Sequence, residues 1–181
     1  RLAAHDVDSL ALSRSQVWQM THMAPPVLDT GAALLLDVGT QTVLYEHNAD
    51  ARWAPASTTK MLTALLALER GKLTDEVVIR AADLDVASAV GLSPGEVWTL
   101  EDLLYDLLLP SDNAAALAIG RHIAGSPQAF VDLMNARVAE WGLRDTHFAN
   151  PHGLDNPQQY STARDLAQIA LHCLSNPQFA A

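Results

Sequence analysis

Apolar and polar residues follow each other along the chain in blocks that predict both strands and helices. Residues 32–38 and 42–46 are short apolar runs on either side of a turn around Gly39, and this pattern predicts a β-hairpin. Residues 57–70 form a longer block whose apolar side chains leave little polar surface. We therefore expect a helix there that is buried on most sides and ends at Gly71.

The rest of the chain predicts one more strand and several helices. "DEVVI" at 75–79 has the composition of a short strand. Thr99 followed by Asp102 resembles a capping box that begins a helix over "EDLLYDLLL", and Pro110 ends this helix. Further helices are expected over 113–125, from Ser126 and Pro127 onwards, and from Thr162 to about Leu174. Helices beside a short antiparallel sheet predict an α/β chain of the α+β type.

The beginning of the chain differs from the rest. Residues 1–24 have only weak periodicity, with a short helix expected within "LALSRSQVWQM". Consecutive prolines at Pro25 and Pro26 break regular structure. We therefore expect an N-terminal extension over 1–24 and one domain over 25–181, because 181 residues are enough for one well-buried core.

Charge and composition exclude some partners. The formal net charge is −10, so phosphate backbones would be repelled and nucleic acid is not expected as a partner. No apolar run approaches the roughly 18 residues that a membrane span requires. Cys173 is the single cysteine, and its apolar helical setting predicts a buried, inert thiol. The chain begins at Arg1 without a signal-peptide pattern, which fits a trimmed mature protein and leaves secretion open.

A serine and a lysine stand three positions apart in "WAPASTTKMLTALLALERG", where the predicted buried helix begins. Residues i and i+3 lie on one face of a helix, about 5–6 Å apart at Cβ, so Ser57 and Lys60 can meet. A serine hydroxyl needs a base to become a nucleophile, and a lysine can be that base when burial keeps it neutral. Ordinary helix-end residues are the alternative. Against it, Lys60 is the only charge between Arg52 and Glu69.

A second polar segment, "LLLPSDNAAALA", connects two of the predicted helices. In it, Ser111 can relay a proton to a leaving amine, and the Asn113 amide can hold a substrate amide or orient Lys60. Serine, aspartate and asparagine are also the usual N-cap and turn residues, so this segment alone does not identify a site. Together with Ser57 and Lys60, however, the segment is much less readily explained as an accident of helix ends and turns.

Histidines and tryptophans are the other candidates for site residues. His147 and His152 flank the "FANP" turn with Asp155 nearby, but their spacing matches no compact zinc pattern. We therefore expect no metal site and no cofactor. The four tryptophans are scattered and are expected to pack in the core or between helices. Trp53 can border a cleft beside Ser57, but packing is the preferred interpretation.

The two polar segments carry a resemblance to a known family. S-x-x-K and S-D-N are two of the three motifs of class A β-lactamases and penicillin-binding proteins, and K-T-G is the third. Four stretches resemble the serine D-alanyl-D-alanine carboxypeptidases, the low-molecular-mass penicillin-binding proteins, from about Pro25 to Phe179: "APASTTKMLTALLALE", "GEVWTLEDLLYDLLLPSDNAAALAIGRHIAGS", "FVDLMNARVAEWGLRDTHFANPHGLD" and "YSTARDLAQIA". The resemblance implies the penicillin-binding, serine β-lactamase-like fold, in which a helical region packs on an antiparallel sheet.

The same resemblance implies roles for individual residues. Ser57 resembles the acyl-forming nucleophile and Lys60 its general base. Ser111 looks like the proton relay and Asn113 like a substrate-orienting amide, whereas Asp112 stands at a variable position and receives no role. The implied reaction releases the terminal D-alanine of peptidoglycan stem peptides through an acyl-serine, which β-lactam antibiotics also form. The implied location is extracytoplasmic, in the bacterial cell envelope.

A class A-like β-lactamase is the weaker alternative. Those enzymes use a glutamate to activate the water that removes the acyl group. After Asn113 the only glutamate is Glu140, which stands within a predicted helix. The "FANPHGLD" stretch also resembles the carboxypeptidases instead.

The third motif is absent from this chain. Lys60 and Lys72 are the only two lysines, and Lys72 is followed by Leu73 and Thr74, so no Lys-Thr-Gly occurs. The resemblance places that motif on a strand beyond the "STARDLAQIA" helix. There it supplies a cation for the terminal carboxylate of the substrate and one oxyanion donor, and the Ser57 N–H supplies the other. We expect an incomplete sheet with an unpaired edge.

Two explanations of the missing motif stay open. The chain is either a fragment, whose remaining strands and any membrane-associating C-terminal segment lie elsewhere, or a degenerate relative. A relative of that kind would be a non-catalytic peptidoglycan-binding or assembly module with the same fold. The presence of all four site residues favours the fragment.

Overall fold

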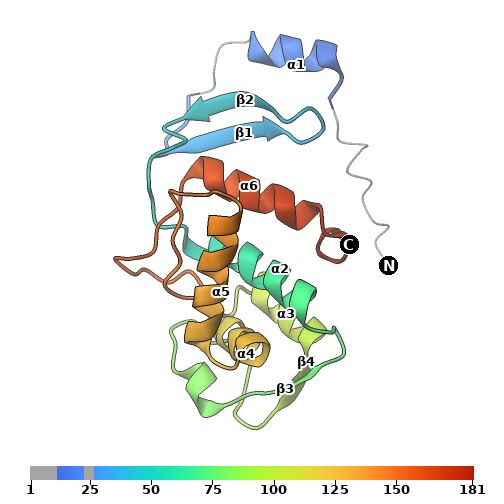
Figure 1. The fold of residues 1–181 in the computed structure, drawn as a ribbon, viewed down its shortest axis with the longest axis vertical. Helices are drawn as coiled ribbons and strands as arrows, with labels where there is room; N and C mark the ends of the chain where they lie inside the picture. The colour runs from blue at the N-terminus through green and yellow to red at the C-terminus, as the bar shows by residue number, and fades with distance from the viewer. Residues whose placement is uncertain (1–11, 23–26) are drawn as a thin grey trace.

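In the computed structural model, which describes residues 12–22 and 27–181, helices stack beside a small antiparallel hairpin (Figure 1). The hairpin lies between the first helix and α6, and α2 lies in the middle of the helical region. The elements in chain order are α1 (Arg14–Thr21), β1 (Ala33–Asp37), β2 (Thr42–His47), the 3₁₀ turn η2 (Ala56–Thr59), α2 (Lys60–Arg70), β3 (Glu76–Val78), the 3₁₀ turn η3 (Ala81–Leu84), β4 (Val97–Thr99), α3 (Leu100–Leu108), α4 (Asn113–Ala124), α5 (Pro127–Glu140), α6 (Ala163–Leu174) and α7 (Pro177–Ala180).

The predicted hairpin and strand are both present. β1 and β2 pair antiparallel, with an irregular register between Leu35 and Leu36. β3 pairs antiparallel with β4, a three-residue strand that the sequence pattern did not predict because it is too short to show an alternation. Among the described residues the two pairs form separate two-stranded sheets, so β1 and β2 have no third strand beside them. Leu35 on β1 remains 48% exposed.

Helix α2 is central, as its apolar composition predicted. One side of α2, including Ala64 and Ala67, packs with α3 and α4 in one apolar cluster. The opposite side, including Leu62 and Leu66, packs with α5 and α6 in a second cluster. Because both clusters depend on α2, the element that carries Lys60 is fixed on two sides.

The ends of the helices follow the predicted signals with one exception. Thr99, Ser126 and Thr162 each accept a hydrogen bond from a backbone N–H of the first turn of the following helix. The predicted helix over 57–70 instead begins as the 3₁₀ turn η2 and becomes α-helical at Lys60. Short 3₁₀ turns are common where an α-helix begins.

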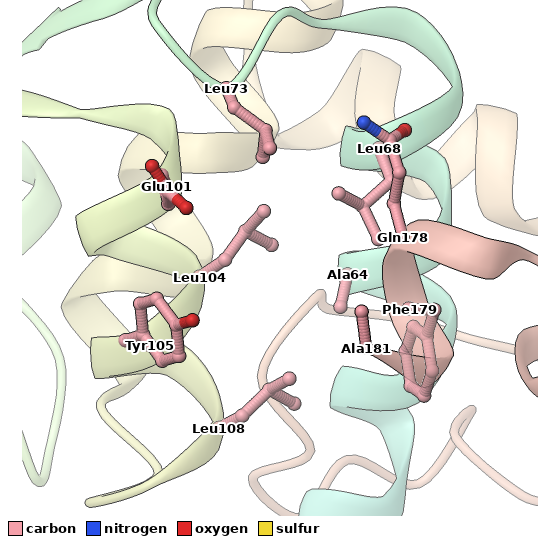
Figure 2. A pocket seen from close by; sticks show the side chains of 10 residues that line it. All are labelled: Ala64, Leu68, Leu73, Glu101, Leu104, Tyr105, Leu108, Gln178, Phe179 and Ala181. Atoms are coloured by element: carbon pink, nitrogen blue, oxygen red, sulfur yellow. The ribbon is translucent and has the colours of Figure 1, made fainter. Parts of the chain in front are cut away.

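An apolar pocket of about 160 Å³ lies between α2, α3 and the end of the chain. Figure 2 shows Leu104 and Leu108 of α3 on one side and Phe179 of α7 on the other. None of the predicted site residues lines this pocket. It is therefore separate from the four predicted site residues Ser57, Lys60, Ser111 and Asn113.

The N-terminal part is only partly described. Helix α1, which lies within the predicted short helical stretch except for Thr21, packs on β2. The predicted boundary at Pro25 and Pro26 lies outside the described residues. Across the ranges 12–22 and 27–181, no helix has both the length and the apolar character to cross a membrane.

Candidate active site

Ser57 and Lys60 face each other across the turn where α2 begins. Side chains at i and i+3 eclipse in a 3₁₀ turn, so η2 places the two residues on the same side of the chain. Lys60 Nζ lies 3.3 Å from Ser57 Oγ. Ala56, just before Ser57, has a φ of +47°, a conformation that costs of order 1–3 kcal/mol for a residue with a side chain. The surrounding structure must therefore hold this turn in place.

The Lys60 side chain is enclosed by fixed acceptors. It is 2% exposed, and Nζ donates to Asn113 Oδ1 and to the carbonyl oxygen of His152, each at 2.6 Å. Burial lowers the pKa of Lys60 to about 8, and the negative charge of Asp112 opposes this shift. A substantial neutral fraction is thus available near physiological pH.

The hydrogen bonds of Lys60 orient its lone pair when the amine is neutral. A neutral amine has two N–H donors and one lone pair. The two short bonds to Asn113 and His152 take both donors, which leaves the lone pair for Ser57 Oγ. The Ser57 hydroxyl can then donate its proton to Nζ, which is the geometry of general-base activation.

Ser111 reaches the site from the turn between α3 and α4, and Asn113 reaches it from the first position of α4. Ser111 Oγ donates to Ser57 Oγ at 2.9 Å, from a residue with a φ of +64°. The Asn113 amide is 5% exposed and is held at both ends, because Nδ2 donates to the Ala87 carbonyl oxygen at 2.8 Å while Oδ1 accepts from Lys60. The structure therefore brings all four predicted residues together, and Asn113 contacts Lys60.

Comparison with known proteins identifies the family. The family model described as D-alanyl-D-alanine carboxypeptidase matches residues 19–179. The chain belongs to the D-alanyl-D-alanine carboxypeptidase family.

Individual relatives agree with this assignment. The chain is 36% identical over 161 residues to the D-alanyl-D-alanine carboxypeptidase DacA of Haemophilus influenzae, covering 84% of this chain and 41% of that protein. It is 38% identical over 149 residues to DacF of Bacillus subtilis, covering 79% and 38%. The crystal structure of DacD from Francisella tularensis superposes with a TM-score of 0.81 at 33% identity, over 87% of this chain and 40% of that one. The chain thus spans about two fifths of the length of these relatives.

Two residues of this carboxypeptidase-family site were missed by sequence reasoning because they act through the backbone. The His152 carbonyl holds Lys60, and Gly153, with a φ of +98°, lies so close to the Ala56 carbonyl that a Cβ would overlap it. Asn150 Oδ1 accepts from both of their N–H groups, at 3.3 and 2.7 Å. The only available signal was the His-Gly pair within "FANPHGLD".

The remaining candidates have local structural roles. His147 Nδ1 bonds the Gln158 carbonyl at 2.7 Å, and the buried His152 ring accepts from Leu154 N at 3.2 Å. Among the described residues no three potential ligands gather as a metal site. Cys173 is 1% exposed, which confirms the predicted burial, and burial raises the pKa of its thiol to about 12. Glu140 pairs with Arg137 at 3.3 Å within α5.

The prediction that all tryptophans are packed was wrong for two of them. Trp18 is 63% and Trp53 is 56% exposed. The Trp53 backbone pairs with Ser161 in an isolated β-bridge, and its indole lies against Gly31, where a Cβ would overlap the ring. The Trp53 indole is therefore packed against backbone on one side and exposed on the other. Amino-acid composition does not show how much of a tryptophan side chain the fold covers.

A half-buried carboxyl group next to Asp112 predicts a pH-dependent stability. Burial, then the charge of Asp112 and a hydrogen bond with Asp112, raise the pKa of Asp106 to about 6. An acid with a raised folded-state pKa stabilises the fold below its unfolded pKa, and this contribution is lost as the pH rises through about 6.

We expect Asp106→Asn to stabilise the protein by about 1–2 kcal/mol at pH 8, which corresponds to a melting temperature higher by roughly 2–8 °C. The gain should be smaller at pH 5, where the wild-type group is already largely protonated. Thermal unfolding at both values measures the difference. Asp155→Asn, at an exposed loop aspartate, is the control. An equal effect of Asp106→Asn at both pH values would contradict the assignment.

Proposed function

We propose that this chain carries the acylating part of a serine D-alanyl-D-alanine carboxypeptidase. Its substrates are peptidoglycan stem peptides that end in D-Ala-D-Ala. One observation supports this most strongly. The side chain of Lys60 is only 2% exposed. In the neutral form of its amine, both N–H groups donate to fixed acceptors, and the lone pair faces Ser57 Oγ. A lysine with only a packing role would not need a serine hydroxyl at that position.

The contacts support an ordered transfer of protons. Neutral Lys60 removes the hydroxyl proton of Ser57, and Oγ forms a bond to the carbonyl carbon of the scissile amide. The resulting tetrahedral intermediate collapses with cleavage of the C–N bond. The proton on Lys60 passes through Ser111 Oγ, 2.9 Å from Ser57 Oγ, to the nitrogen of the leaving D-alanine. Water then hydrolyses the acyl-Ser57 ester. We assign Asn113 to orientation of Lys60 and of a substrate amide.

The proposal also accounts for what the chain lacks. It contains no Lys-Thr-Gly, and within the described part β1 pairs only with β2. We infer that a strand carrying this motif completes the sheet and binds the substrate carboxylate. Loss of one oxyanion donor alone costs on the order of 10²–10³ in rate, so we expect this chain by itself to be acylated slowly.

Ligands and location follow from the proposed reaction. β-Lactams present a strained amide to the same nucleophile and form an acyl-Ser57. Peptidoglycan lies outside the cytoplasmic membrane, so we propose an extracytoplasmic location. Residues 25–181 would form the catalytic domain and 1–24 an extension from it. Membrane association through a further C-terminal segment is part of this proposal.

Incubation with a fluorescent penicillin, followed by mass spectrometry of the Ser57 peptide, tests the assignment. We expect a covalent adduct on Ser57 that forms over hours and is absent from Ser57→Ala. The matched control is Ser88→Ala, which removes an exposed hydroxyl from the loop that contacts Asn113. It should leave the adduct unchanged.

A longer chain that includes Lys-Thr-Gly separates the two explanations of the missing motif. We expect it to acylate at least about 10²-fold faster and to release D-alanine. If such a chain forms no adduct, the site is not catalytic, and a peptidoglycan-binding or assembly module is the correct interpretation. Rapid D-alanine release by the 181-residue chain would instead show that the strand is dispensable.

A further inference from the structure

Asp112, which lies between Ser111 and Asn113, is bound far more extensively than a turn residue requires. Its side chain is completely buried. One carboxylate oxygen accepts from the N–H groups of Ala114 and Ala115, at 2.6 and 3.4 Å, and caps α4. The other accepts from Val90 N at 2.7 Å. The capping bonds would be sufficient for a helix terminus, so the bond to Val90 needs a separate explanation.

The bond to Val90 joins the turn to the loop that precedes β4. Asn113 binds the same loop, because its Nδ2 donates to the Ala87 carbonyl and its backbone N–H donates to the Ser88 carbonyl at 3.3 Å. Ser88 and Ser111 have φ values of +59° and +64°. Residues with side chains keep such conformations only where surrounding bonds enforce them. Asp112 thus helps to hold both strained residues, one of which carries the hydroxyl that contacts Ser57.

Asp112 also acts on the site through its charge. Asp112 adjoins Asn113, whose Oδ1 accepts from Lys60 Nζ at 2.6 Å, and its buried carboxylate is poorly screened by solvent. Its charge therefore favours the protonated form of the Lys60 amine. The other titratable groups around this pair are Asp106 on α3, which faces Asp112, and His152, which faces Lys60 from the loop after α5. Burial lowers the pKa of His152 to about 4, so this ring is neutral where Lys60 titrates.

We propose that Asp112 is a positioning residue of the acyl-transfer site, which fixes Ser111 and Asn113 through its backbone bonds and adjusts the protonation of Lys60 through its charge. The inference rests on the proposed function. It assigns a role to the middle residue of the S-D-N segment, to which the family resemblance assigns none.

Lysine NMR tests the electrostatic part directly, because the chain has only two lysines. With lysine labelled by ¹³C at Cε, a pH titration gives one resonance for each, and Lys72→Arg assigns them. We expect Lys60 to titrate near pH 8 in the wild type and at a lower pH in Asp112→Asn. Asp132→Asn, which removes an equal charge from an exposed position on α5, should leave the Lys60 titration unchanged.

Amide hydrogen exchange tests the positioning part in the same variants. Asparagine can still cap α4 through its carbonyl oxygen, but it presents an amino group to Val90 N–H. We therefore expect Asp112→Asn to keep the protection of the Ala114 amide and to lose that of Val90. Asp112→Ala should lose both. If Asp112→Ala does not fold, Asp112→Asn alone still gives both readouts.

The outcomes separate this inference from the proposed function. An unchanged Lys60 pKa in Asp112→Asn would overturn the electrostatic role, and an unchanged Val90 amide would overturn the positioning role. Neither measurement depends on turnover. A chain whose Ser57 is never acylated would refute the proposed function and still report whether Asp112 acts on Lys60.

Discussion

Replacing Gly153 by alanine is expected to abolish acylation of Ser57 and to destabilise the protein by about 3–5 kcal/mol. A Cβ at this position would overlap the Ala56 carbonyl and lie 3.0 Å from Ser57 N. The φ of +98° adds strain of its own. Since the collision is with backbone atoms, no side-chain rotation can relieve it, and the turn that presents Ser57 must move.

Gly142→Ala separates the effect of the Cβ collision from the effect of a positive φ. Gly142 has a φ of +75°, yet a Cβ there would meet nothing within 4 Å. We expect this control to cost only about 1–2 kcal/mol and to leave Ser57 acylation unchanged. Urea unfolding and penicillin labelling of both variants give the comparison. Equal losses of stability would mean that strain alone explains Gly153, and normal labelling of Gly153→Ala would show that the Ser57 turn does not depend on this contact.

The sequence predicted those parts of the fold that depend on local pattern. The apolar block 57–70 indicated a central helix, and the caps at Thr99, Ser126 and Thr162 indicated where helices begin. β4 was missed because three residues show no periodicity and are defined only by pairing with β3. The 3₁₀ turn at Ser57 was missed because it depends on contacts with the loop around Gly153.

For the candidate site too, the sequence pattern predicted only the contact between residues that are close together in the chain. Ser57 and Lys60 are close in sequence, so their contact could be predicted from helical spacing. Ser111 and Asn113 lie more than 50 positions away, and their place in the site followed from a family resemblance. His152 was missed because it contributes a backbone carbonyl, which every residue has. Gly153 was missed because its role is to leave space where a side chain would collide with the Ala56 carbonyl. The role of Asp112 was missed because it depends on hydrogen bonds from N–H groups that only the folded chain brings together.

Lys60→Met is expected to lower the rate of Ser57 acylation by about 10²–10⁴-fold, the usual contribution of a general base. Methionine fills much of the same volume but cannot accept a proton. In the wild type, the rate should rise about tenfold for each pH unit below the Lys60 pKa and level off above about 8, because only the neutral amine has a free lone pair. The depressed pKa thus makes acylation faster at neutral pH than an ordinary lysine would allow.

Penicillin labelling of Ser57 between pH 6 and about 9.5 measures this profile. Slow labelling by the 181-residue chain does not prevent the test, since rates are compared within one chain over hours. Lys72→Met removes the other, exposed lysine and should leave rate and profile unchanged. If Lys60→Met is labelled within threefold of the wild type, or if the wild-type rate does not change between pH 6 and 8, Lys60 is not the base. The buried amine would then serve only to hold Asn113 and the His152 carbonyl in place.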